Sequence, residues 1–251
     1  MENQTQKEAL QYVASLAMTA ADKRIINVDT TVGERTFAVD RDGDVVEFRP
    51  HDGASRELNV HTLGSIIDYI THVQERRERR LIVEIVDENV VKVYGELDPF
   101  GERELLLVSE ADHPQFPFGR YLDREAFNIA LQSQFVANTD QTLLLKFVGN
   151  MKEDATKTST DDGVTQVATV KTGVASVSDA IVPNPVTLAP FRTFSEINQP
   201  ESGFVFRVSE GMQAALFEAD GGRWRNEAIN RIADYLSKGL EEEIDRVTIL
   251  A

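Results

Sequence analysis

Three apolar runs follow one another between residues 80 and 110, and they constrain the fold more than any other part of the sequence. The runs are RLIVEIVD, VVKVYGEL and RELLLVSE, and only the turn segments DEN at 87–89 and DPFGER at 98–103 separate them. Runs of this kind, bounded by turn residues, predict an antiparallel meander of strands. An apolar stripe in residues 62–77 predicts a helix directly before the meander. This order of elements is typical of the α+β class and not of a doubly wound sheet.

The N-terminal residues predict a helix and three short strands. Apolar residues recur at helical steps in residues 2–20, which predicts an amphipathic helix that packs on another surface. These apolar residues include Leu10, Val13 and Leu16. The runs RIINV, RTFAVD and VVEFR predict strands, and DRDGD at 40–44 predicts the hairpin turn between the last two. We expect one α+β region over 1–110 and a second over 111–251, or a single continuous domain.

The second half of the chain predicts further helices and antiparallel strands. Asp123 can cap a helix that follows the proline-bearing segment 112–122, and Asp140 can cap a second helix in DQTLLLKFVGNM. The runs GFVFRVS and QAALFEA predict a strand pair, residues 222–240 predict a packing helix, and RVTILA predicts a last strand. The apolar stripe of the packing helix consists of Trp224, Ala228, Ile232, Leu236 and Leu240.

Residues 152–182 differ from the rest of the chain, because they are rich in Thr, Ser, Val and Asp and contain no aromatic residue. One interpretation is a mobile loop. The alternative is a protruding two-stranded β-arm over 164–171 and 174–182 with a turn at 171–173, since β-branched residues favour strands. The regularly spaced valines are Val164, Val167, Val170, Val174 and Val177. Such an arm needs a partner surface, in the same chain or in another copy.

Composition excludes several classes of function. The net charge of −16 opposes contact with a nucleic-acid backbone, which requires clustered lysine and arginine. The basic cluster QERRERR at 74–80 fits the solvated end of a helix, and a local phosphate patch is the alternative. The absence of cysteine excludes disulfides, thiolate metal sites and cysteine nucleophiles. Without a long apolar run or a secretory start, we expect a cytoplasmic protein that has no membrane contact, cofactor or metal.

The segment LFEADGGRW at 216–224 raises the question of a chemical site. Gly221 and Gly222 permit a sharp reversal of the chain, and Asp220 can accept hydrogen bonds from the first turn of the following helix. The segment lacks the lysine of a phosphate loop and the spaced glycines of a dinucleotide loop. We interpret it as a capped turn between strand and helix, and an anion site that uses Asp220 and Arg223 is the alternative.

Catalytic motifs are absent from the sequence. It contains neither the Gly-x-Ser-x-Gly motif of serine hydrolases nor a histidine pair with metal-ligand spacing. His113, beside Asp112 in a loop, is the best single candidate for acid–base work, although a lone histidine is more often structural. A small-ligand or nucleotide-processing enzyme would use His113, Arg120, Asp220 and Arg223 around one pocket.

Five segments of the chain carry a resemblance to a known family. They are FPFGRYLDREAFNIALQSQF, KFVGN, TSTDDGVTQ, LAPFRTF and ALFEADGGRW. In this order they resemble the YfdQ-like family of bacteriophage and prophage proteins, over residues 1–251 and most strongly from about residue 112 onward. The resemblance implies a phage-encoded protein, made in the host bacterial cytoplasm and distinct from the head and tail proteins. It assigns no catalytic residue to this chain.

The sequence favours a non-enzymatic protein that self-assembles into a symmetric homo-oligomer, as a cage or as a sponge for a host factor or a small signalling molecule. The expected subunit contacts are Leu10, Val13, Leu16, Val167, Val170, Val174 and Val177. The alternatives are the enzyme described above and an acidic DNA mimic that titrates a host protein. The expected partners are other copies of the chain and possible host proteins or small molecules, and not nucleic acid or a membrane.

Overall fold

The computed structural model describes residues 25–30, 33–39, 45–48, 53–73, 79–98, 101–151, 159–161, 166–168, 182–209 and 211–251. The chain forms two compact units. Unit 1 comprises Met1–Ser55 and Leu97–Glu104, and unit 2 comprises Arg56–Glu96 and Leu105–Ala251. Helices occur together with antiparallel and mixed sheets, which confirms the α+β class. The expected division into regions 1–110 and 111–251, or into one continuous domain, stays a prediction.

The larger sheet of unit 2 has five strands in the order β14-β5-β6-β7-β4. Its members are β4 (Leu58–Val60), β5 (Leu81–Ile85), β6 (Val90–Leu97), β7 (Arg103–Glu110) and β14 (Val247–Leu250). The central strands β5, β6 and β7 are neighbours in chain order, as the meander predicts, and β5 pairs with β6 antiparallel. Both edge strands pair in parallel, β4 with β7 and β14 with β5. The sequence analysis did not predict these parallel pairs.

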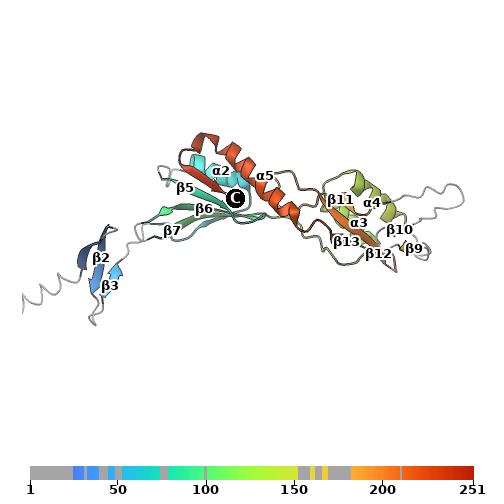
Figure 1. The fold of residues 1–251 in the computed structure, drawn as a ribbon, viewed down its shortest axis with the longest axis horizontal. Helices are drawn as coiled ribbons and strands as arrows, with labels where there is room; N and C mark the ends of the chain where they lie inside the picture. The colour runs from blue at the N-terminus through green and yellow to red at the C-terminus, as the bar shows by residue number, and fades with distance from the viewer. Residues whose placement is uncertain are drawn as a thin grey trace, which may run out of the picture. The chain divides into compact units, whose positions relative to one another are not determined.

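Two helices cover one face of this sheet, α2 (Leu63–His72) and α5 (Arg223–Gly239) (Figure 1). Alternate residues of β5 point into the first core, since Leu81, Val83 and Ile85 are buried and their neighbours are only half-buried. The predicted stripe of α5 is confirmed, because its apolar members are buried in the structure. The two helices approach closely at Gly239, where an added Cβ would lie 2.2 Å from Cδ1 of Ile67.

A second sheet in unit 2 has the antiparallel order β11-β12-β13-β8. Its strands are β8 (Leu122–Asp123), β11 (Val186–Leu188), β12 (Ser202–Ser209) and β13 (Gln213–Glu218). Helices α3 (Arg124–Ser133) and α4 (Thr139–Gly149) enclose the second core with this sheet. The second core is rich in phenylalanine, and Phe118 stacks on Phe204 with ring centroids 5.2 Å apart. The predicted pair of strands near 203–209 and 213–219 is confirmed, because β12 and β13 pair antiparallel.

The helix caps agree with the sequence at α3 and differ from it at α4. Asp123 caps α3, because its Oδ1 accepts the Ala126 N–H at 2.8 Å. The prediction that Asp140 caps the next helix is wrong, since Asn138 accepts the Gln141 N–H at 2.8 Å. Asp140 already lies in the first turn of α4, and its carboxylate accepts the Thr187 N–H of β11 at 2.8 Å instead.

Unit 1 contains a three-stranded antiparallel sheet in the order β1-β2-β3. The strands are β1 (Ile25–Thr30), β2 (Gly33–Val39) and β3 (Val45–Phe48). Val39 pairs with Val45, as expected for strands joined by a hairpin at 40–44. The hairpin turn itself and the helix predicted for residues 2–20 lie outside the described residues.

The region of the predicted β-arm contains a short antiparallel pair, β9 (Ser159–Asp161) with β10 (Gln166–Ala168). Strand β10 falls within the predicted strand 164–171. Its partner among the described residues precedes it in the chain, whereas the sequence analysis expected a partner at 174–182. Within that expected partner only Val182 is described, and it is buried outside regular secondary structure.

Candidate functional site

The segment LFEADGGRW forms the turn between β13 and α5. Gly221 and Gly222 have positive φ angles of 65° and 80°, a conformation that glycine adopts without strain. Asp220 Oδ1 accepts the Gly222 N–H at 3.0 Å, and its Oδ2 accepts the Trp224 N–H at 3.4 Å. Asp220 therefore satisfies free N–H groups at the start of α5, as the capped-turn interpretation expects.

A buried arginine from another segment lies against this turn. Arg192, which follows β11, is only 6% exposed, and its guanidinium carbon lies 3.7 Å from the ring centroid of Trp224. The guanidinium of Arg225 lies 5.2 Å from the same centroid. The only tryptophan of the chain therefore takes part in two cation–π contacts.

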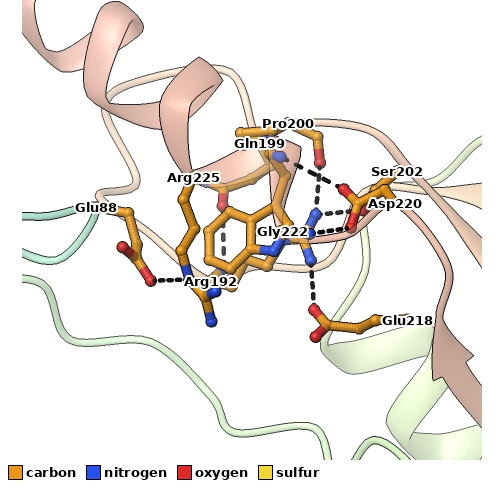
Figure 2. A network of polar contacts seen from close by, with 10 residues as sticks. Glu88, Arg192, Gln199, Pro200, Ser202, Glu218, Asp220, Gly222 and Arg225 are labelled. Carbon is orange, nitrogen blue, oxygen red and sulfur yellow. Dashed lines mark hydrogen bonds and ion pairs between the residues drawn. The ribbon is translucent and has the colours of Figure 1, made fainter.

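Arg192 is the centre of a polar network (Figure 2). Its Nη1 donates to Glu218 Oε1 at 3.1 Å, and its Nη2 donates to the Ser202 hydroxyl and to the Pro200 carbonyl. The backbone N–H of Arg192 donates to Gln199 Oε1 at 3.0 Å. These contacts provide the hydrogen-bond partners that a buried cation needs.

Burial lowers the pKa of Arg192 to about 10, and the nearby carboxylates of Glu218, Asp220 and Glu88 oppose this shift. Arg225 lowers the pKa further, because it carries a charge of the same sign. The Arg192 guanidinium consequently stays protonated at neutral pH.

The network connects the two cores of unit 2. Arg225 Nε donates to Glu88 Oε1 at 2.9 Å, and Glu88 lies in the turn between β5 and β6. The Thr193 hydroxyl donates to the backbone carbonyl of the same Glu88. The chain leaves the second core after Leu188 and enters the first core at Phe194, so that Arg192 lies at the crossing between them.

The chemistry of the network is that of a structural junction. Its carboxylates are engaged by guanidinium and backbone N–H groups. Arg192 Nε and Trp224 Nε1 are buried and have no hydrogen-bond partner within the described residues. Across the part of the chain that the structure describes, no group of three His, Asp or Glu residues is arranged to hold a metal ion.

The four predicted ligand-binding residues occupy different surroundings. His113 is half-buried, donates from Nδ1 to the Pro114 carbonyl at 3.1 Å, and has its Nε2 3.1 Å from the side-chain amide of Asn89. Asp220 lies in the turn before α5, and Arg223 is the exposed first residue of that helix, whose backbone N–H donates to the Asp220 carbonyl. Arg120 is exposed in the segment before β8. Among the described residues no side-chain hydrogen bond or ion pair joins these four, and their common pocket stays a prediction.

The sequence analysis missed Arg192 as the organising residue. It treated PNPVTLAPFRTF as an extended connection and assigned no role to its single charged side chain. A signal was present, because Arg192 stands between two phenylalanines in an otherwise uncharged segment. A lone cation in such surroundings is typical of a buried, paired charge.

Most of the predicted oligomer contacts lie outside the described residues, namely Leu10, Val13, Leu16, Val170, Val174 and Val177. The backbone of Val167 belongs to β10, where it pairs with Thr160. Subunit contact at these positions therefore stays a prediction.

The sheet of unit 1 is a second candidate site, because it presents uncovered apolar side chains. Ile25, Val28 and Val45 are 66%, 41% and 62% exposed. None of the unit 1 residues whose side chains are described is buried. In unit 2, by contrast, both cores contain side chains with no exposed surface.

The strand register assigns the described residues of this sheet to two faces. Val28 pairs with Arg35, Phe37 pairs with Glu47, and Val45 pairs with Val39. Paired residues lie on the same face of a sheet, and so do alternate residues of one strand. One face therefore carries Val28, Arg35, Phe37, Val45 and Glu47, and we call it the Arg35 face. Across it, Arg35 Nη1 lies 3.1 Å from Glu47 Oε1.

The opposite face of the unit 1 sheet has a different composition. Ile25 pairs with Ala38, and Asn27 pairs with Thr36. The Thr36 hydroxyl donates to Asn27 Oδ1 at 3.0 Å. The register also assigns Asp29 and Glu34, which pair with each other, to this opposite face. Both are acidic, so among the residues of the described strands only the Arg35 face combines apolar groups with charges of opposite sign.

None of the helices in the described part of the chain combines the length and the apolar character needed to cross a membrane. No protein-family model matches this chain, and no curated protein or solved structure is significantly similar to it.

Proposed function

We propose that this protein is not an enzyme and that it acts by self-association into a symmetric homo-oligomer to which unit 1 contributes contacts. The observation that carries the proposal is the unit 1 sheet, whose described side chains include no buried residue. A sheet of three strands needs a covered apolar face for independent stability. Contact with another copy of the chain supplies that cover.

The exposed side chains provide the driving force for association. Complete burial of one Val, Ile or Phe side chain contributes about 1.5–3 kcal/mol. Val28 and Val45 are exposed and the half-buried Phe37 lies on the same face, so a symmetric contact covers these side chains of both copies. The gain is reduced by the entropy of association and by the ordering of side chains, so several such residues are needed.

The sheet edges offer a further route for contact. Strands β1 and β3 are the outer strands of the unit 1 sheet. Edge strands carry backbone groups that can pair with another chain, and natural proteins often use them in assemblies. Exposed apolar residues on these strands, Ile25 and Val45, favour an assembly role.

We include in this proposal a phage origin and a role as a cage or as a sponge for a host factor or a small signalling molecule. The resemblance of five sequence segments to phage proteins supports the origin. The absence of catalytic motifs from the sequence supports a role in binding or sequestration. The host bacterial cytoplasm is the location that follows from a phage origin.

Light scattering coupled to size-exclusion chromatography tests the self-association. We expect a mass that is a multiple of 28.0 kDa over the micromolar range. Val45→Asp should lower that mass, because it places a charge on an exposed apolar position of unit 1. Ile244→Asp is the matched control, since Ile244 is 76% exposed in unit 2. A wild-type chain of monomer mass at all these concentrations refutes the proposal.

A further inference from the structure

We propose that two copies of the chain stack the Arg35 face against itself about a two-fold axis, with Arg35 of each copy next to the partner subunit's Glu47. This inference rests on the proposed self-association and specifies its contact surface. It commits to a second copy as the occupant of the face.

The charge of the face is the first argument. The chain carries a net charge of −16, so two copies repel each other over most of their surface. The described charges of the Arg35 face are one cation and one anion, which cancel. Copies that meet at this face add no net like charge to the contact.

The arrangement of the two charges is the second argument. Arg35 and Glu47 come from neighbouring strands and lie 3.1 Å apart, with their side chains 32% and 17% exposed. A two-fold axis that runs between the stacked sheets and midway between these residues brings each charge over its opposite in the partner. The face is thus complementary to itself, which is the requirement for an isologous contact.

The apolar residues around the charges are the third argument. Val28 and Val45, on the outer strands, and Phe37, on the central strand, surround the charge pair on the same face. They provide burial, while the four alternating charges of the dimer fix its orientation. Charge pairs at interfaces contribute mainly to specificity and orientation in this way.

The test uses Arg35→Glu and Glu47→Arg in the full chain. Each variant alone places like charges opposite each other twice in the homodimer, so we expect the Kd of self-association to rise roughly tenfold or more. An equimolar mixture of the two variants restores both attractive pairs across the contact. We therefore expect the mixture to associate as the wild-type chain does, as a complex containing one copy of each variant.

The equimolar mixture distinguishes two cases. In one case the Arg35 face contacts another copy, and in the other case a segment of the same chain covers it. Within each variant the charges at positions 35 and 47 have the same sign, and mixing does not change this. Recovery of association on mixing therefore requires contact between copies. Fluorescence of the buried Trp224 reports in each sample that unit 2 remains folded.

The outcomes distinguish this inference from the proposed function. A monomeric wild-type chain overturns both. An oligomeric wild-type chain whose Kd is unchanged by either variant overturns the Arg35 face and leaves self-association standing. Loss of association in both variants without recovery on mixing also overturns the stacked face, because the pair then acts within one chain or toward a different partner.

Discussion

The two units of this chain use similar strands for different purposes. In unit 2, Phe127, Phe204 and Ile232 have no exposed surface, because helices cover the sheets. In unit 1, Val28 and Val45 lie on a sheet whose described side chains are all at least partly exposed. The difference teaches that an apolar strand pattern indicates a buried face but does not indicate which helix, segment or partner covers that face. Unit 2 provides its own cover, and we propose that unit 1 obtains cover from another copy.

The most direct way to break the comparison is to truncate one phenylalanine in each unit. Phe204→Ala removes a fully buried ring and should lower the free energy of unfolding by about 3–5 kcal/mol. Phe37→Ala should change the unfolding of unit 2 by less than about 0.5 kcal/mol and weaken self-association instead. Urea denaturation and light scattering measure the two effects. Equal losses of unfolding free energy would contradict the distinction between the units.

The next effect sharpens the comparison within unit 2, where polar contacts join the two cores. Arg192→Met removes the charge-assisted hydrogen bond to the part-exposed Glu218 and the contact with Trp224, which should cost about 1.5–3 kcal/mol of unfolding free energy. Arg223→Met is the control at an exposed position and should change stability by about 0.5 kcal/mol or less. Urea denaturation followed by tryptophan fluorescence measures both. If Arg192→Met left the free energy of unfolding unchanged, the two cores would not need the polar contacts of Arg192 for stability.

A smaller effect is expected at the turn before α5. Gly222→Ala places a Cβ at φ 80° and 3.1 Å from Arg225 Nη1, and should cost about 1–2 kcal/mol. Gly64→Ala is the matched control in helix α2, since its Cβ meets no atom within 4 Å and alanine favours helices. Thermal unfolding distinguishes the pair. Neither change should alter self-association, and a change in oligomer mass would extend the assembly surface into unit 2.

The smallest effect concerns alkaline pH. Because burial lowers the pKa of Arg192 to about 10, the unfolded chain holds this proton more tightly than the folded chain. As the pH rises above about 10, the folded state loses the proton first, and folding gains stability from this group. The stability of wild type relative to Arg192→Met should therefore rise above about pH 10 and be constant between about pH 7 and pH 10, where the carboxylates around Arg192 do not titrate. If the stability of wild type relative to Arg192→Met fell as the pH rose above about 10, burial would not be the dominant influence on the pKa of Arg192.

The fold was predictable where the periodicity of the sequence was long and local. The stripe of α5 and the central strands β5 to β7 follow from the spacing of apolar residues, and Asp123 was identified as a cap from its position. The parallel partners β4 and β14 were not predictable in this way, because short apolar runs do not specify which distant strand they join. At α4 the cap prediction failed by two residues, since Asn138 and Asp140 are both good capping residues and only the backbone conformation decides between them.

The candidate site was predictable only in part. The turn at Gly221 and Gly222 follows from local chemistry, and the structure contains it. The polar network beside this turn involves Arg192, Gln199 and Ser202, which are distant from the turn in sequence. Contacts of this kind depend on tertiary packing, and no local pattern specifies them. The uncovered sheet of unit 1 is a similar case, because its strands were expected and their exposure was not.

The parallel pairing of β14 with β5 has a consequence for how the chain is made. Strand β5 emerges from the ribosome long before β14, and the whole second sheet is synthesised between them. Until residues 247–250 appear, the edge of β5 next to them is open to foreign strands. The first core is therefore completed only after the second sheet has been synthesised, although most of its own sheet is translated early, and the nascent chain depends on residues 247–250 to close that edge.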